Sequence, residues 1–174
     1  RLKSDRILNF EATANGTIVN VKPDFSRATT PYFIFKDVNG QFLISNSESI
    51  DSDNQNDYAT VVFTYVPPNR LPLVGETLYL SGSLTNNVLD ETAEMKFNAV
   101  TRAYQKSLLL KQGYYSYSYI LRDKTAPDPM FDFNETEGDH WETENAYSIF
   151  IYYRPPGARH DHLIGFTTVH SNQY

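Results

Sequence analysis

The sequence predicts an all-β protein, and three observations support this prediction. Aromatic residues make up 14% of the chain, mostly as 13 Tyr and 11 Phe, and aromatic side chains favour the half-buried surface of a β-sheet. Two Asn-Gly dipeptides separate apolar segments, as in tight β-hairpins. From residue 58 onward, short β-rich segments recur between clusters of Gly and Pro. Together these features are typical of a sandwich of short strands.

The first 56 residues contain both Asn-Gly turns, at Asn15-Gly16 and Asn39-Gly40. Two hairpins are therefore expected, with strands at Ile7–Ala14, Thr17–Val21, Tyr32–Val38 and Gln41–Ser45. Two hairpins are too few to bury an independent core. We expect residues 1–56 to pack on the sandwich or on a preceding β domain. The polar stretch Ser45–Asp57 is interpreted as a linker or a long exposed loop.

Residues 57–174 are predicted to form an immunoglobulin-like sandwich, because seven short strands with turn residues between them fit that fold. The expected strands are Tyr58–Val66, Thr77–Ser81, Met95–Asn98, Ser107–Leu110, Tyr115–Arg122, Tyr147–Arg154 and Leu163–His170. Alternation places Tyr117, Tyr119 and Leu121 on one face, together with Tyr115. The segment Tyr147–Tyr153 is apolar on both faces, which predicts a central strand or a contact with a neighbouring domain.

Composition excludes several classes of function. The net charge of −6 argues against nucleic acid, because phosphate binding needs a clustered positive surface. There are no cysteines, so disulfides, thiolate metal sites and cysteine nucleophiles are absent. No apolar run approaches the roughly 20 residues of a membrane helix, and we expect no direct lipid insertion. The chain begins with Arg1 rather than Met, and we expect it to be a fragment of a longer protein.

Motifs for catalysis and metal binding are weak. His160 and His162 flank Asp161 and would form a two-point metal site on a strand, but they follow Pro155-Pro156-Gly157 and are expected to be exposed loop residues. The acidic stretch at residues 51–57 lacks the Gly and Glu of a calcium loop. The chain has no nucleophile elbow, phosphate loop or dinucleotide fingerprint. We therefore predict no catalytic residues, no metal and no cofactor.

An acidic segment surrounds the single Trp, in the run Glu135–Asn145. It is open to three interpretations: a solvated turn with Trp141 packed over a sheet edge, an acidic docking surface around an aromatic anchor, or paired carboxylates for acid–base chemistry. The candidate interaction surface combines this segment with the strand exit that follows. Its residues are Trp141, Glu142, Glu144, Arg154 and Arg159. The alternative is that Trp141 closes the edge of the sandwich and that Arg154 pairs with a nearby Glu.

Residues 78–123 resemble the early-set immunoglobulin-like modules of starch- and glycogen-handling proteins. The matching residues are Gly82, Met95, Tyr104, Leu108–Leu110, Gly113, Tyr115, Tyr117 and Tyr119. Those modules stack sugar rings on Trp in the loop after the first Gly and near the central aromatic. Here the loop Ser83–Asn87 has no aromatic residue and the central position is Tyr104, so the resemblance implies the fold and leaves carbohydrate binding as the alternative function.

A longer resemblance covers most of the chain, at residues 31–44, 57–68, 108–121 and 137–165. These segments are similar to the C-terminal part of the type IX secretion system plug family. The most specific element combines EGDHWETEN with YYRPPGAR. The resemblance implies an exported, periplasmic, non-enzymatic protein that associates with the outer membrane through a partner. That partner would be the large translocon pore, whose periplasmic end the plug caps when the channel is idle.

Overall fold

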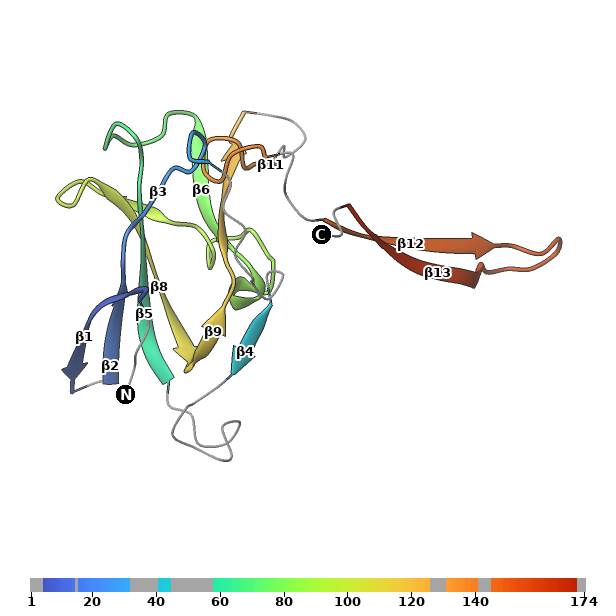
Figure 1. Cartoon of the computed structure of the whole chain (residues 1–174), viewed down its shortest axis with the longest axis horizontal. Helices are drawn as coiled ribbons and strands as arrows, with labels where there is room; N and C mark the ends of the chain where they lie inside the picture. Colours follow the sequence, from blue (N-terminus) through green and yellow to red (C-terminus); the bar gives the residue numbers. More distant parts are fainter. Residues whose placement is uncertain are drawn as a thin grey trace. The chain divides into compact units, whose positions relative to one another are not determined.

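The computed structural model describes residues 5–14, 16–31, 41–44, 58–125, 131–140 and 145–171. These residues form an all-β structure with several sheets (Figure 1). No α-helix occurs in the described ranges, and the search there for an apolar helix of membrane-spanning length finds none. The described residues belong to two compact units, one ending at Asp139 and the other beginning at His140. Each unit is described separately below.

The largest sheet of the first unit has its strands in the order β1-β2-β5-β8-β7, and β3 also pairs with β5. Figure 1 shows β5 and β8 side by side in this unit. The strands are β1 (Ile7–Thr13), β2 (Gly16–Val21), β3 (Asp24–Phe25), β5 (Tyr58–Val66), β7 (Lys96–Asn98) and β8 (Ala103–Lys111). The pairs β2–β5 and β3–β5 are parallel. The predicted first hairpin is thus confirmed, and it extends the sheet that contains β5.

Two smaller sheets complete the first unit. One has the order β11-β10-β6, and the other pairs β4 with β9. Their strands are β4 (Phe42–Ile44), β6 (Glu76–Ser81), β9 (Gly113–Tyr115), β10 (Ser118–Asp123) and β11 (Phe131–Asp132). A short 3₁₀ turn, η1 (Ser83–Thr85), follows β6.

One hydrophobic core joins the β5–β8 sheet to the β6–β10 sheet. Its buried side chains are Phe63, Tyr65, Leu78, Leu80, Met95, Tyr104, Tyr119 and Leu121. Within β5, β6 and β10 these residues are spaced by two, because alternate side chains of a strand point to the same face. The predicted inward face of Tyr117, Tyr119 and Leu121 is confirmed, since Tyr117 packs against the same core.

The structure divides the strand expected at Tyr115–Arg122 into two. β9 pairs with β4, whereas β10 pairs with β6, so the chain passes from one sheet to another between them. The partners of a strand lie far away in sequence, and a continuous alternation does not reveal such a change of partner. The strand expected at Tyr32–Val38 and the whole linker Ser45–Asp57 lie outside the described residues.

Two glycines of the early-set pattern stand where the backbone leaves no room for a side chain. A Cβ on Gly82 would lie 2.7 Å from the carbonyl oxygen of Ser116. A Cβ on Gly113 would lie 2.6 Å from the carbonyl oxygen of Leu43. Both distances are shorter than van der Waals contact, so glycine is required where β6 ends and where β4 meets β9.

The second unit contains a two-stranded ribbon of β12 (Ala146–Tyr153) and β13 (His162–His170). Within the described residues β12 pairs only with β13, and both expectations for Tyr147–Tyr153, a central strand or a contact with a neighbouring domain, stay predictions. The described residues divide between Asp139 and His140 into two compact units, and the expected limits of 1–56 and 57–174 stay a prediction. Apolar residues on both faces of a strand indicate that both faces are buried in the native protein, but they do not indicate which surface buries them.

The first prediction concerns the core. Leu78→Ala removes a side chain that is 0% exposed, and we expect the free energy of unfolding to fall by about 2–5 kcal/mol. Val74→Ala is the matched control, because Val74 is 93% exposed and its loss is expected to cost less than about 0.5 kcal/mol. Urea unfolding measures both variants. Equal effects of the two substitutions would place Leu78 outside the core.

Candidate functional site

The ribbon of β12 and β13 exposes apolar side chains on both of its faces. Neither strand contains Asp, Glu, Lys or Arg. Phe150 and Phe166 form a cross-strand pair with ring centroids 5.0 Å apart. Ile149 and Ile151 alternate with Phe150 and therefore lie on the opposite face. Ten large apolar or aromatic residues are each 46–62% exposed: Tyr147, Ile149, Phe150, Ile151, Tyr152, Tyr153, Leu163, Ile164, Phe166 and Val169.

Polar contacts frame this apolar span at both ends. At the base, the Asn145 amide donates to Ser171 Oγ at 2.9 Å, and the Ser171 amide donates to the Asn145 carbonyl at 2.9 Å. At the tip, Arg154 donates from Nε and Nη2 to the two carboxylate oxygens of Asp161, at 2.7 and 3.1 Å. The two-pronged geometry fixes both side chains in the loop between the strands. The segment without acidic or basic side chains therefore ends at the Asn145–Ser171 contact on one side and at the Arg154–Asp161 ion pair on the other.

The structure describes the predicted interaction residues only in part. Arg154 and Arg159 lie in the same exposed tip loop. The Arg154 guanidinium pairs with Asp161 and not with a Glu as in the alternative. Trp141, Glu142 and Glu144 lie outside the described residues, so their part of the surface stays a prediction.

The two histidines of the tip also lie together. The rings of His160 and His162 stack with centroids 4.8 Å apart. The carboxylate of the intervening Asp161 is engaged by Arg154. Across the described ranges, no group of three or more His, Asp or Glu side chains is placed to hold a metal ion.

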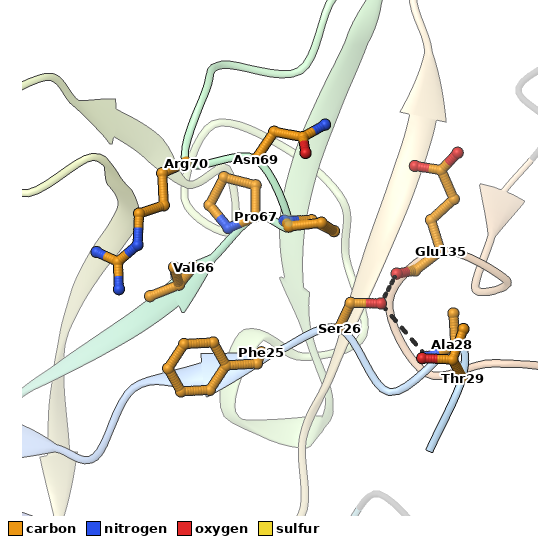
Figure 2. Close-up of a pocket in the computed structure, with 10 residues that line it drawn as sticks. Phe25, Ser26, Ala28, Thr29, Val66, Pro67, Asn69, Arg70 and Glu135 are labelled. Atoms are coloured by element: carbon orange, nitrogen blue, oxygen red, sulfur yellow. Dashed lines mark hydrogen bonds between the residues drawn. The ribbon is translucent and has the colours of Figure 1, made fainter.

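A separate hollow of about 570 Å³ lies in the first unit (Figure 2). Its walls come from the chain after β3, from the turn after β5 and from Glu135. The lining residues are Phe25, Ser26, Ala28, Thr29, Val66, Pro67, Pro68, Asn69, Arg70 and Glu135. Ser26 Oγ donates to the Glu135 carbonyl at 2.6 Å and accepts from the Ala28 amide at 3.3 Å. The hollow thus combines an aromatic ring with hydrogen-bond donors and acceptors.

A polar cluster around Asp24 anchors β3 beside β10. The Asp24 carboxylate accepts from Arg6 Nη2 at 2.6 Å, from the Tyr117 hydroxyl at 3.0 Å and from the Tyr119 hydroxyl at 2.8 Å. Burial, followed by the negative charge of Asp24, raises the pKa of Tyr117 to about 12 and that of Tyr119 further. Both hydroxyls therefore remain protonated donors at neutral pH. Through these hydrogen bonds the cluster links segments that are distant in sequence.

Glu137 is a second acidic residue that contacts β10. Its Oε1 accepts from the Tyr119 amide at 3.1 Å, and Oε2 lies 3.7 Å from Arg27 Nη1. Burial raises the pKa of Glu137 above its ordinary value, and this effect exceeds the opposing hydrogen bond from Tyr119 and the charge of Arg27. The carboxyl group therefore holds its proton more tightly in the folded chain than in the unfolded chain.

Sequence analysis did not identify the hollow or the Asp24 cluster. In the sequence, Pro67 and Pro68 indicate only a turn between two strands. Asp24 and Arg6 carry no motif, and they meet Tyr117 through the folding of segments about one hundred residues apart. The sequence indicated only that Tyr117 and Tyr119 lie on the inward face of a strand. That pattern predicts the burial of their rings, but it does not predict which residues accept hydrogen bonds from their hydroxyl groups.

Comparisons with known proteins find a solved structure of similar fold, and they carry no function. No protein-family model matches the chain, and no curated protein matches it. A solved structure of a hypothetical protein from Parabacteroides merdae ATCC 43184 is similar, with 37% sequence identity and a TM-score of 0.88. The similarity covers 98% of this chain and 42% of that one. The chain thus spans less than half the length of this neighbour.

The second prediction concerns pH. A carboxyl group whose pKa is raised on folding favours the folded state when protonated. The wild type should therefore gain stability relative to Glu137→Gln as pH falls through the raised pKa toward the ordinary value of 4.5. The difference should be constant above and below that interval. Urea unfolding from roughly pH 3 to pH 8 measures it.

Glu91→Gln is the control, because it removes one negative charge at an exposed position. If the wild type instead lost stability relative to Glu137→Gln as the pH fell, then the charged carboxylate would be the stabilised form. In that case the attraction of Arg27 would outweigh burial.

Proposed function

We propose that this chain is a non-enzymatic protein-interaction module of the kind that plugs the type IX secretion translocon. The observation that carries this proposal is the uncharged ribbon with both faces exposed. Soluble proteins rarely expose contiguous apolar patches larger than a few hundred Å², and larger patches mark interaction sites. A ribbon of this kind therefore serves to contact another protein surface.

The body of the chain suits a plug. A plug needs rigidity, a soluble surface and no chemistry of its own. The early-set immunoglobulin-like sandwich that the sequence resembles supplies such a body, and the core between the β5–β8 and β6–β10 sheets supports its rigidity. The net charge of −6 favours solubility. In this proposal the protein is periplasmic and reaches the outer membrane through its partner rather than by lipid insertion.

The interaction surface proposed for this function extends from the ribbon into its flanking segments. Trp141, Glu142 and Glu144 precede β12 in the sequence, and Arg154 and Arg159 lie at its exit. Tyr, Trp and Arg are the residue types enriched where binding energy concentrates. The polar flanks around an apolar centre also match the anatomy of reversible interfaces.

The third prediction tests the partner. Affinity purification of the full-length protein from its native outer membrane, after cross-linking, should recover a very large β-barrel translocon protein, identified by mass spectrometry. Leu109→Lys, which changes an exposed residue of β8 (68% exposed), is the control and should leave the recovery unchanged. Recovery of glycan-processing proteins alone, or of no membrane protein, would contradict the proposal.

Carbohydrate binding is the second candidate function, and the hollow of Figure 2 favours it. Phe25 is 57% exposed and can stack against the apolar face of a sugar ring. Asn69, Arg70 and Glu135 offer both donors and acceptors to hydroxyl groups. Tyr104 is not the platform, because it is 7% exposed and its hydroxyl accepts from the Leu73 amide at 2.8 Å.

The fourth prediction tests this candidate by titration with cyclodextrins, soluble starch and a glycan array. If the hollow binds sugar, the dissociation constant should be about millimolar or tighter, and Phe25→Ala should weaken binding at least roughly tenfold. Phe10→Ala is the control, because Phe10 is 61% exposed on β1 and does not line the hollow. Absence of binding by the wild type would reject the carbohydrate function.

A further inference from the structure

Side chains, rather than a strand, bond to the outer edge of β10 at Tyr119. Further along this edge, β11 pairs with Leu121 and Arg122. At Tyr119 the backbone groups bond instead to the turn that follows β11. The Thr136 hydroxyl donates to the Tyr119 carbonyl at 2.6 Å, and Glu137 Oε1 accepts from the Tyr119 amide at 3.1 Å. Thr136 thus supplies the donor, and Glu137 the acceptor, that a neighbouring strand would provide.

The same turn also holds the chain that leaves β3. The Ser26 hydroxyl donates to the Glu135 carbonyl at 2.6 Å (Figure 2). The Arg27 amide donates to the Thr136 carbonyl at 2.8 Å. Arg27 Nη1 also lies 3.7 Å from Glu137 Oε2. The turn therefore ties β10 to the segment after β3.

Residues 133–138 make up this turn, which we call the latch turn. The Phe133 carbonyl accepts from the amides of Thr136, Glu137 and Gly138, at 3.1, 2.7 and 3.1 Å. Gly138 ends the turn with a φ of +82°, in the left-handed region that favours glycine. The latch turn is thus one small unit closed on a single carbonyl.

Polar contacts hold the latch turn in place. Among the described residues, neither the core cluster of the first unit nor the hydrophobic side chains packed against it include a residue of this turn. Segments with few buried apolar contacts open at a lower free energy than the core does. The latch turn can therefore open while the two sheets of the core stay packed.

We propose that residues 133–138 form a latch that opens locally, with the core of the first unit still folded, and that its opening lengthens the connection to β12. The first unit ends at Asp139, and β12 begins at Ala146. Release of the latch turn adds its six residues to that connection, which is about 20 Å of extended chain. The latch thus sets how much chain separates the ribbon from the packed core. The inference goes beyond the proposed function, because it holds whatever the partner is.

Protonation of Glu137 strengthens the closed latch. The charged or titratable groups that face its carboxyl group are Arg27, Asp24 and Tyr65. Burial, the largest effect, raises the pKa of Glu137, and the charge of Asp24 adds to this rise. The hydrogen bond from Tyr119 and the charge of Arg27 oppose the rise without cancelling it. The closed latch is therefore most stable below the ordinary pKa of 4.5, and it loosens as the pH rises through the raised pKa.

Hydrogen exchange of the full-length protein, followed by NMR, tests the latch. The amides of Tyr119, Arg27 and Gly138 report on the latch, and the amide of Leu80, which donates to the Ala93 carbonyl, reports on the core. We expect the latch amides to share one protection factor, at least about tenfold below that of the core amide. Low concentrations of urea should lower the protection of the core amide steeply and that of the latch amides little, because local opening exposes little surface. Equal protection, or an equal response to urea, would overturn the inference.

Thr136→Val removes the hydroxyl group that bonds to the Tyr119 carbonyl. It should lower the protection of the latch amides about fivefold or more, because one buried hydrogen bond is lost. Thr101→Val, at an exposed position, is the matched control and should leave that protection unchanged. Unchanged protection in Thr136→Val would contradict a latch held by this side chain.

Glu137→Gln imitates the protonated carboxyl group and tests the role of the proton. In the wild type, the protection of the latch amides should fall as the pH rises from about 4 to about 8. This fall should be lost in Glu137→Gln and kept in Glu91→Gln, which removes an exposed charge. A rise of protection with pH in the wild type, or a fall that persists in Glu137→Gln, would overturn the role of Glu137.

Discussion

The first unit depends on one contact, the packing of β5 against β10 through their inward aromatic side chains. The rings of Tyr65 and Tyr119 lie 4.9 Å apart, and those of Phe63 and Tyr117 lie 5.0 Å apart. These pairs join the two principal sheets and exclude water from the leucines of β6, which are 0% exposed. Aromatic pairs add about 0.5–1.5 kcal/mol beyond the area that they bury. The other described strands of the first unit pair within one of these two sheets, except for β4 and β9, which pair with each other.

The partly buried carboxylate of Asp24 is the second constraint, and it depends on the first. Packing of Tyr117 and Tyr119 into the core brings both hydroxyl groups to the end of β3, where the Asp24 carboxylate accepts hydrogen bonds from them and from Arg6. A partly buried carboxylate without such donors would be destabilising. The N-terminal segment is therefore fixed to β10 by a polar contact that has its donors and acceptor matched.

The ribbon differs from the first unit, because its two strands do not enclose a hydrophobic core. In the first unit, alternate side chains are buried against a facing sheet. In the ribbon, both sets of side chains are about half exposed. A two-stranded hairpin is marginally stable in water, so in the proposed function its apolar faces contact a partner rather than supply internal stability. The proposed function rests on this contrast between the packed first unit and the exposed apolar side chains of the ribbon.

The sequence by itself determined the all-β class, the position of most strands and the inward face of Tyr117, Tyr119 and Leu121. These features are local, since the period of two and the Asn-Gly turn depend on neighbours along the chain. It also singled out Gly82 and Gly113 through a resemblance, and the structure supplied the reason in the backbone contacts with Ser116 and Leu43.

Only the tertiary structure decided which strands pair and where the candidate surfaces lie. The parallel pairing of β2 with β5, the division between β9 and β10, and the meeting of Asp24 with Tyr119 all join residues distant in sequence. The same holds for the ribbon: apolar residues on both faces of β12 indicate that it needs a covering layer, but its assignment to a second compact unit followed from the contacts of the whole chain. Local patterns determine what a strand must bury, whereas the surface that buries it depends on the competition among all strands for partners.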